Sequence, residues 1–381
     1  MKKSLFIAAL ATVALASCSN DEVLEMKQDQ IKFTAVAGKV SRGTEVTAST
    51  LKSFNVWGWV EQTGTGDANY ETLYFSNVAF TGTAVTPATD PVTYTNPYTS
   101  EIPYWWPTGA MKFYALNYFD TANGVTLDEE DFSTGKFSFF VNSTVADQKD
   151  LLYAAQIGVS KADANQNGLP LNFRHALSQI EFNVGLDEVA NTKLPLEVVI
   201  TSIAVKNLDG SATFTMPEMS TIPYYNDDPY KEEKEGVQVQ VSTENDGSWG
   251  EWSDNDNDIP AVSYTITESA TIRNDKFEEA DEVTDGFVPY GGTDAERMFL
   301  IPQPLDGSSI VVNCDIWAKG ENKVKVHSGE LTYDFADGAE WKQGMKYVYN
   351  LKFGVTSLQQ IKFSVTVDKY QTATGDPIEV K

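Results

Sequence analysis

The sequence predicts an all-β protein built from many short strands. Apolar and polar residues alternate in KFSFFV from Lys136, in SQIEFNV from Ser178 and in KYVYNLKF from Lys346. A period of two places successive side chains on opposite faces of a strand. Turn-forming residues separate such runs, as in TGTGDAN from Thr63 and ATDP from Ala88, and no stretch shows an equally clear helical period.

The length predicts two domains, because 381 residues exceed one small domain and can bury two cores. Turn formers gather in SKADANQNGLP, from Ser160 to Pro170, and this stretch marks the expected boundary. We therefore expect the first domain over residues 31–168 and the second over residues 169–381.

The boundary stretch spaces oxygen-bearing side chains as a calcium loop does, at Asp163, Asn165 and Asn167, with Gly168 next. Position twelve of that pattern is Arg174, where the loop needs a bidentate glutamate. The sequence therefore favours a turn here and predicts no metal site.

An acidic segment stands apart in the second domain, at about residues 218–285. It holds nineteen Asp or Glu residues against four Lys or Arg residues. Few of its parts resemble a core strand, so we expect a long solvated excursion from the domain, ordered around Trp249, Trp252 and Tyr264. It is expected to be a variable surface loop, and the alternative is an elaboration that contacts a ligand.

Residues 1–17 are typical of a bacterial signal peptide, because Lys2 and Lys3 precede an apolar run too short to remain as a membrane helix. The run ends in LASC, a lipobox, which predicts cleavage before Cys18 and lipid on its thiol. Residues 18–30 then form an acidic tether. With Cys18 lipidated, Cys314 has no partner, and we expect it to be a small buried hydrophobe on a strand.

Charge argues against nucleic acid as a partner. The whole chain has 28 basic and 54 acidic side chains, so loss of Lys2 and Lys3 leaves 26 − 54 = −28. Such a chain repels nucleic acid and anionic lipid.

Catalytic patterns are scarce, and we predict that the protein is not an enzyme and needs no cofactor. Only two histidines occur. His175 lies among apolar residues and is expected to be structural, whereas His327 lies on a lysine-rich strand that looks exposed. Neither accompanies a nucleophile motif. A glycoside hydrolase that uses paired carboxylates stays open as the weakest alternative.

Several stretches, taken in order, resemble a known family. They are EIPYWWPTGAMKFYALNYF, KDLLYA, FRHALSQIEFNV, FLIPQPL, WKQGMKYVYNLKF and IKFSVTVDKY, which begin at residues 101, 149, 173, 299, 341 and 361. Together they resemble the fimbrillin-like lipoproteins of Bacteroidales, the subunits of type V pili.

The resemblance implies two β-sandwich domains of transthyretin-like type in tandem. It also implies an outer-membrane lipoprotein of the cell surface and fimbrium that supports cell adhesion. In such a subunit an arginine-specific protease trims the amino-terminal strand, and subunits then polymerise with other pilus subunits by strand exchange. Arg42, followed by Gly43, stands where that cleavage would fall.

Two similar stretches fit strand exchange on their own chemistry. In the first, alternation places four side chains on one face, Ile31, Phe33, Ala35 and Ala37. In the last, the corresponding four are Ile361, Phe363, Val365 and Val367. Both could fill the groove that a missing strand leaves in a sheet. The alternative is that any half-buried strand alternates in this way.

Side-chain size predicts which of the two stretches fills the groove more favourably. Two valines in place of two alanines add about four methyl or methylene groups at about 0.8 kcal/mol each, an upper limit near 3 kcal/mol. The first stretch holds the groove while it is tethered, and a cut after Arg42 removes that advantage. We therefore predict a displaced strand near the amino terminus and a donor strand near the carboxy terminus.

Other roles remain compatible with the sequence. A tip adhesin or an uncleaved anchor subunit would share most of these features. A surface glycan-binding lipoprotein is the main alternative, in which exposed tryptophans stack on sugar rings. The candidate side chains are Trp105, Trp106, Trp249 and Trp252.

Overall fold

The computed structural model describes residues 29–37, 50–63, 69–85, 93–117, 124–126, 132–186, 196–221, 246–250, 261–273, 286–291, 297–353 and 362–369. Within these ranges the regular structure is β-strand, with three single-turn 3-10 helices at Phe132–Thr134, Val145–Asp147 and Lys161–Asp163. The all-β prediction is therefore confirmed. None of the helices in the described part could cross a membrane.

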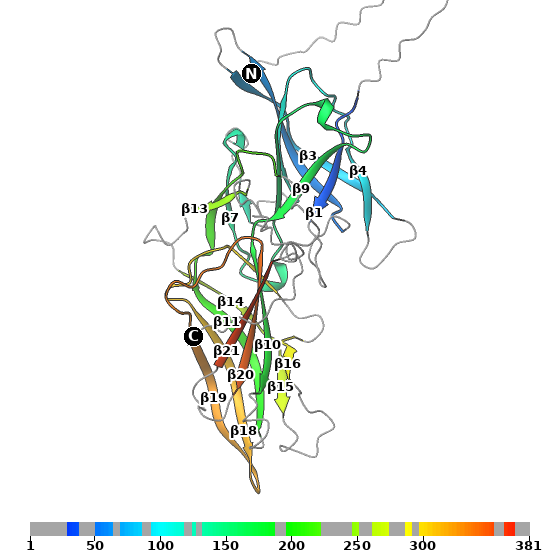
Figure 1. Ribbon diagram of the computed structural model, residues 1–381. Coiled ribbons are helices and arrows are strands. Elements are labelled where there is room, and N and C mark those ends of the chain that lie inside the picture. The colour runs from blue at the N-terminus through cyan, green and yellow to red at the C-terminus, as the bar shows by residue number, and fades with distance from the viewer. Residues whose placement is uncertain are drawn as a thin grey trace, which may run out of the picture.

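Seven strands close into a barrel at one end of the molecule (Figure 1). Their order around the barrel is β1-β4-β3-β2-β5-β8-β9. The bounds are β1 Phe33–Ala37, β2 Ser53–Thr63, β3 Asn69–Ala84, β4 Tyr94–Ser100, β5 Met111–Leu116, β8 Leu152–Val159 and β9 Leu169–His175. Hydrogen bonds run around the whole ring, so this unit is one closed sheet.

Two further sheets face each other at the opposite end of the molecule (Figure 1). One has the order β16-β10-β20-β21, with β17 also on β10, and the other has the order β14-β11-β18-β19, with β15 also on β11. The first comprises β10 Ser178–Leu186, β16 Phe287–Pro289, β17 Met298–Leu300, β20 Met345–Phe353 and β21 Lys362–Lys369. The second comprises β11 Leu196–Leu208, β14 Val262–Ile266, β15 Ala270–Arg273, β18 Ser309–Lys319 and β19 Lys323–Asp334.

A small sheet between these units takes strands from both halves of the chain. Its order is β13-β12-β7-β6, with β6 Val125–Thr126, β7 Lys136–Phe140, β12 Ser211–Thr215 and β13 Ser248–Gly250. Because β7 pairs with β12 over five residues, the two halves of the chain are hydrogen-bonded to each other.

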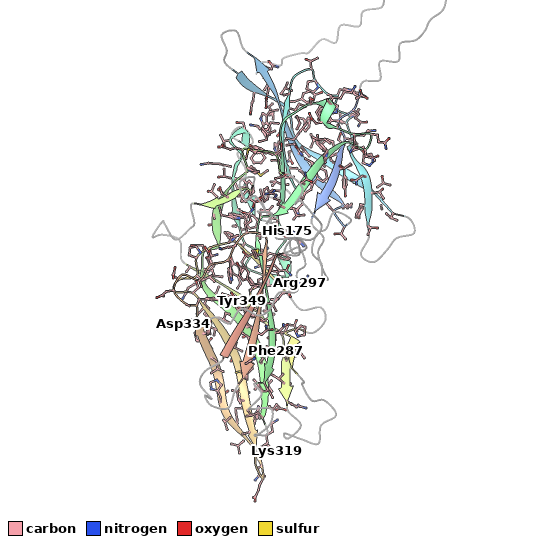
Figure 2. The ribbon with its side chains drawn as sticks, viewed as in Figure 1. His175, Phe287, Arg297, Lys319, Asp334 and Tyr349 are labelled. Carbon is pink, nitrogen blue, oxygen red and sulfur yellow. The ribbon has the colours of Figure 1, made fainter. Side chains whose placement is uncertain are left out.

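Two apolar cores follow from this arrangement. One fills the barrel and includes Phe33, Phe54 and Phe113. The other begins on the outside of the barrel with Trp57 and continues without a break between the facing sheets. All six residues of β5 are buried, because both faces of that strand are covered. Figure 2 places His175 between the barrel and the facing sheets.

The domain boundary differs from the expectation. Leu169–His175 was expected to open the second domain, but as β9 it completes the barrel between β8 and β1. The turn at residues 160–168 therefore joins two neighbouring barrel strands. The facing sheets agree with a sandwich, and the transthyretin-like type remains a prediction.

The described parts of residues 218–285 pack around Trp249 and Tyr264, as expected, but they also form paired strands that a solvated excursion does not predict. The strands β14 and β15 both pair with β11, and their side chains Tyr264, Ile266 and Ile272 are buried. Trp249 packs against the core, and its Nε1 donates a hydrogen bond of 2.6 Å to the carbonyl of Ala176. The count of acidic residues over the whole segment gave no sign of these strands, because most of those residues lie outside β14 and β15.

Candidate functional site

The barrel closes at β1, and the two sides of this closure are unequal. On one side β1 pairs in parallel with β9 through five positions, from Phe33 opposite Leu169 to Ala37 opposite Phe173. On the other side it pairs with β4 at one position only, Phe33 opposite Tyr98. The strand β1 is thus held mainly by β9 and by its side chains.

Phe33 anchors β1 in the centre of the barrel. Its side chain is fully buried and meets three other phenylalanine rings edge-on, with ring centroids 4.7 Å away at Phe80, 5.2 Å at Phe113 and 6.2 Å at Phe54. Edge-to-face contacts of this kind add to the apolar burial. Ile31 is also fully buried, so the alternate residues Ile31, Phe33 and Ala35 point into the core.

Backbone hydrogen bonds fix the segment that leads into β1. The N–H of Ile31 donates to the carbonyl of Tyr104 at 2.8 Å, and the N–H of Trp106 donates to the carbonyl of Asp29 at 3.2 Å. The N–H of Leu169 donates to the carbonyl of Lys32 at 2.8 Å. The segment therefore crosses the end of the barrel between the loop before β5 and the start of β9.

Gly168 lets this segment come close to β9. Its φ is +112°, and a Cβ built on it would lie 2.5 Å from the carbonyl oxygen of Lys32. A side chain at this position would therefore collide with the backbone of the incoming segment. The stretch predicted to be a turn does turn, with Asn165 and Gly168 hydrogen-bonded to each other.

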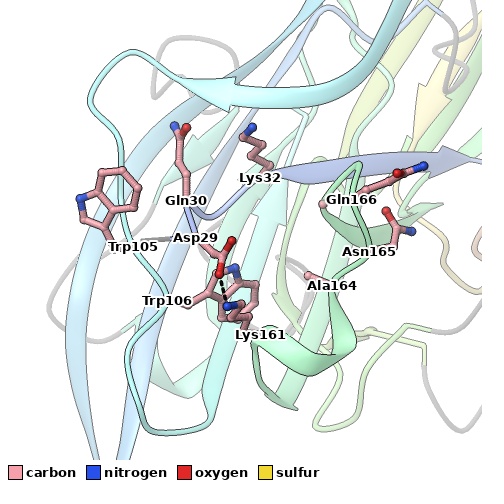
Figure 3. Close-up of a pocket in the computed structure, with 10 residues that line it drawn as sticks. Asp29, Gln30, Lys32, Trp105, Trp106, Lys161, Ala164, Asn165 and Gln166 are labelled. Atoms are coloured by element: carbon pink, nitrogen blue, oxygen red, sulfur yellow. Dashed lines mark ion pairs between the residues drawn. The ribbon is translucent and has the colours of Figure 1, made fainter. Parts of the chain in front are cut away.

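A cavity of about 550 Å³ lies where the segment enters the barrel (Figure 3). It is lined by Asp29, Gln30, Lys32, Trp105, Trp106, Lys161, Ala164, Asn165, Gln166 and Gly168. The lining comes from three parts of the chain: the segment before β1, the loop before β5 and the turn between β8 and β9. An ion pair between Asp29 and Lys161 joins the first and third of these.

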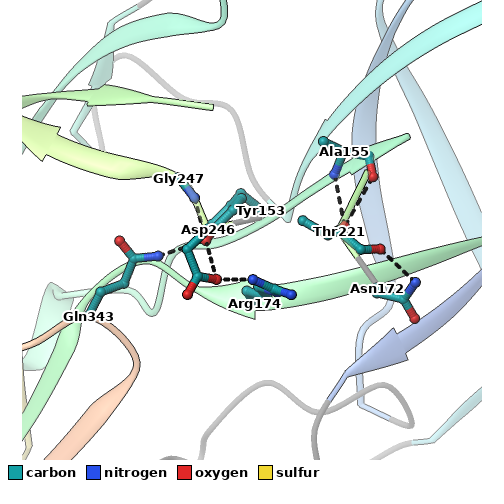
Figure 4. Close-up of polar contacts among 8 residues, drawn as sticks. All are labelled: Tyr153, Ala155, Asn172, Arg174, Thr221, Asp246, Gly247 and Gln343. Atoms are coloured by element: carbon teal, nitrogen blue, oxygen red, sulfur yellow. Dashed lines mark hydrogen bonds and ion pairs between the residues drawn. The ribbon is translucent and has the colours of Figure 1, made fainter. Parts of the chain in front are cut away.

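The far side of β9 is bound to the second half of the chain (Figure 4). The strands β8 and β9 pair directly at only two positions. Beyond them Thr221 lies between the strands. Its N–H donates to the carbonyl of Ala155 at 2.9 Å, and its own carbonyl accepts a bond of 2.8 Å from the side chain of Asn172. Thr221 thus joins the two strands where they separate.

A second group of contacts holds the end of β9 nearest the facing sheets. Arg174 is buried and forms an ion pair with Asp246. The hydroxyl of Tyr153 accepts bonds of 2.9 Å from the N–H of Gly247 and 2.7 Å from the side chain of Gln343 (Figure 4). Residues 246–247 belong to the acidic segment, which therefore supports the barrel strand that carries β1.

The predicted displaced strand lies at this closure. Ile31, Phe33 and Ala35 are buried, as their common face requires, and Ala37 ends β1 opposite Phe173. Cys18, Arg42 and Gly43 lie outside the described residues, so their predicted lipidation and cleavage remain predictions.

The predicted donor strand is β21, and it has a place of its own. Phe363, Val365 and Val367 lie opposite Leu351, Tyr349 and Tyr347 of β20. Among the described strands it is the last in its sheet, and its one partner there is β20. Ile361 lies outside the described residues.

Of the remaining candidate residues, some line the cavity and others are packed inside the protein. Trp105 is 39% exposed and lines the cavity, whereas Trp249 is partly buried and packs against the core. Trp252 lies outside the described residues. His175 is buried, and its Nδ1 lies 2.8 Å from the carboxylate of Asp150, so it has the hydrogen bond that we expect of it; its structural role remains a prediction.

The prediction for Cys314 is confirmed. It lies on β18 and is buried, and this burial raises the pKa of its thiol to about 12, with a smaller contribution from Asp315. Burial also raises the pKa of Tyr98, beside β1, to about 12, and nearby Tyr94 adds to the shift. The hydroxyl of Tyr98 donates a 2.6 Å hydrogen bond to the carbonyl of Leu51.

Sequence reasoning missed β9 as the partner of β1, and it missed the cavity. Parallel pairing between Phe33 and Leu169 joins residues far apart in the chain, and no local pattern encodes it. Gly168 was noted only as part of a turn. Its position beside a predicted domain boundary could have suggested a close backbone contact.

One solved structure with a TM-score above 0.5 supports the fold. A fimbrial protein from Bacteroides vulgatus ATCC 8482 is 14% identical, with a TM-score of 0.58 over 90% of this chain and 99% of that chain. A putative cell adhesion protein from Bacteroides uniformis ATCC 8492 is 13% identical, with a TM-score of 0.47 over 90% of this chain and 99% of that chain. No curated protein matches the chain.

The family model described as fimbrillin-like matches residues 41–369. This range covers the facing sheets and every strand of the barrel except β1, which ends at Ala37. The chain belongs to the fimbrillin-like family.

Proposed function

We propose that this chain is a structural subunit of a type V pilus that supports cell adhesion. In this proposal it is exported as a lipoprotein, anchored in the outer membrane through Cys18, and cut after Arg42. Subunits then join when the carboxy-terminal strand of one replaces β1 of the next. Membership of the fimbrillin-like family supports the role of a pilus subunit.

The observation that carries the exchange is the position of β1 at the closure of the barrel. Departure of β1 would leave unpaired backbone along β9 and β4, and it would uncover the rings of Phe54, Phe80 and Phe113. An open sheet edge beside an apolar groove is what an added strand recognises. The cut proposed after Arg42 lies five residues beyond the end of β1.

The length and place of β21 suit it as the incoming strand. It has eight residues against five in β1, and β9 has seven, of which β1 uses five. A longer strand can therefore make more ladder bonds along the same edge. Because β21 is an edge strand, it can leave its own sheet without breaking an interior ladder.

The proposal is tested by treating the folded chain with an arginine-specific protease. We expect a new amino terminus at Gly43, followed by ladders of oligomers in unboiled gels. Arg42→Gln should abolish both. Cleavage only at other sites, or a product that stays monomeric under all conditions, would contradict the proposal.

A matched pair of variants tests the donor strand. Val365→Asp places a charge on the face that we propose to fill the groove, whereas Thr366→Asp places it on the opposite face. We expect normal cleavage in both chains, loss of the ladder in the first and its retention in the second. Circular dichroism spectra should confirm that both chains are folded, and equal polymerisation of the two would reject β21 as the donor.

A further inference from the structure

The cavity at the start of β1 has the size of a small-molecule site, with a lining that combines two tryptophans with charged and amide side chains. Its volume of about 550 Å³ lies within the usual range of about 300–1,000 Å³ for such sites. Among the residues that line the cavity, Trp105 lies on one side and Asn165 and Gln166 lie on the other. The Asp29–Lys161 ion pair lies between them (Figure 3).

The aromatic part of the lining suits the face of a sugar ring. Trp106 is half-buried and held edge-on against Phe113, with ring centroids 5.8 Å apart, so its orientation is fixed by the barrel core. Trp105 keeps 39% of its surface exposed in the same lining. Indole rings offer flat, polarisable surfaces on which the C–H bonds of a sugar ring can pack.

The polar part of the lining favours one carboxylate, from one sugar unit, inside the cavity. Lys161 is paired with Asp29, but Lys32 makes no ion pair among the described residues. Within that part of the chain, Lys32 therefore offers one ammonium group to one carboxylate. The carboxylate of Asp29 and a net charge of −26 oppose a group with several closely spaced charges, such as a polyphosphate. The side-chain amides of Gln30, Asn165 and Gln166 provide donors and acceptors for hydroxyl groups.

We propose that this cavity binds a carboxylated sugar unit, of the uronic acid class, and does so only while the segment before β1 remains in place. Asp29, Gln30 and Lys32 form one wall of the cavity and precede the proposed cut after Arg42. Exchange of β1 would remove that wall. The dependence on β1 rests on the proposed function, whereas sugar binding by the full chain does not.

Thermodynamic linkage determines how strongly sugar binding should oppose release of the cut segment. A ligand that binds only the form with the segment in place stabilises that form by the factor 1 + [L]/Kd. At a ligand concentration about ten times Kd, release of the cut segment should therefore be about tenfold less favourable.

Binding is tested by calorimetric titration of the uncut full chain with trigalacturonate, with maltotriose as the neutral trisaccharide. We expect trigalacturonate to bind at least tenfold more tightly than maltotriose. Lys32→Gln and Trp105→Ala should each weaken trigalacturonate binding at least tenfold. Trp317→Ala removes a half-buried tryptophan of β18 in the facing sheets and should leave binding unchanged.

Two results of the titration would overturn the site. One is no heat of binding with trigalacturonate at millimolar concentrations. The other is equal binding of trigalacturonate and maltotriose, which would reject the role given to Lys32. Unchanged melting temperatures would show that the variants are folded.

A second arm tests the dependence on β1. After cleavage with the arginine-specific protease, size-exclusion chromatography follows release of the amino-terminal segment with and without saturating trigalacturonate. We expect less release with the sugar, and trigalacturonate should not bind the chain from which the segment has gone. Equal release, or full binding after release, would reject the coupling. Failure of cleavage at Arg42 would count against the proposed function, while the titration would still decide the site.

Discussion

Gly168 carries a backbone requirement that is specific to the closure of the barrel. Its φ of +112° already disfavours other residues, and the backbone of Lys32 lies where a Cβ would be. Gly158, on β8 in the same barrel, also has a positive φ, +67°, but a Cβ there would meet nothing within 4 Å. A substitution at Gly158 therefore introduces backbone strain alone, whereas a substitution at Gly168 introduces strain and a collision with the segment before β1.

We predict that Gly168→Ala loosens β1 more than Gly158→Ala does. Left-handed strain costs about 1–3 kcal/mol at either position, and the first substitution adds the collision with Lys32. Hydrogen exchange over residues 31–37 should rise in Gly168→Ala and stay near the parent value in Gly158→Ala. Equal exchange in the two variants would show that the close contact does not govern β1.

At the scale of elements, β9 is the strand on which the barrel closure depends. It holds β1 on one edge, and Thr221 and the Arg174–Asp246 ion pair hold it from the other. The side chain of Arg174 is 2% exposed and that of Asp246 is 25% exposed, so this ion pair is largely removed from water. The ion pair between Lys206 and Glu330 lies on the surface and gives a comparison.

We predict that Asp246→Ala lowers the free energy of unfolding by about 3 kcal/mol, because it removes a charged partner from buried Arg174. Glu330→Ala should cost about 0–1 kcal/mol, as for other exposed ion pairs. Urea denaturation of both variants measures the difference. If Asp246→Ala costs no more than Glu330→Ala, the contact between β9 and the acidic segment does not stabilise the barrel.

Over the whole molecule, buried tyrosines in both cores have a raised pKa, so the barrel and the facing sheets should both lose stability at high pH. Burial is the main cause that raises the pKa of Tyr98, Tyr114 and Tyr347 to about 12 from an ordinary value of 10.0. Tyr98 lies in the barrel core, whereas Tyr114 and Tyr347 lie in the continuous core that reaches between the facing sheets.

The sign of the effect follows from which state keeps the proton. The folded chain holds these protons to higher pH than the unfolded chain, so their contribution to stability is fully present below about pH 10 and is lost between about pH 10 and pH 12. We predict that the melting temperature falls steeply in that range. Tyr98→Phe should make the fall shallower without changing the slope between about pH 7 and pH 9. Identical alkaline slopes in the two chains would contradict the prediction.

The sequence by itself determined the strand character of the chain and the faces of several strands. Alternation predicted that Ile31, Phe33 and Ala35 share a buried face, and it identified strands at Lys136, Ser178 and Lys346. Local alternation predicts strands and their buried faces because the period of two depends only on the geometry of the strand and on exposure of one face to water.

The tertiary structure alone decided which strands are partners. It placed β9 in the barrel rather than in the second domain, brought β14 and β15 into the core, and assembled the cavity from three distant segments. The physical reason is that any strand offers the same backbone donors and acceptors along both edges. Which strand fills each edge is settled by closure of the barrel and by burial of side chains such as Phe33 and Tyr264, and those contacts join residues far apart in the sequence.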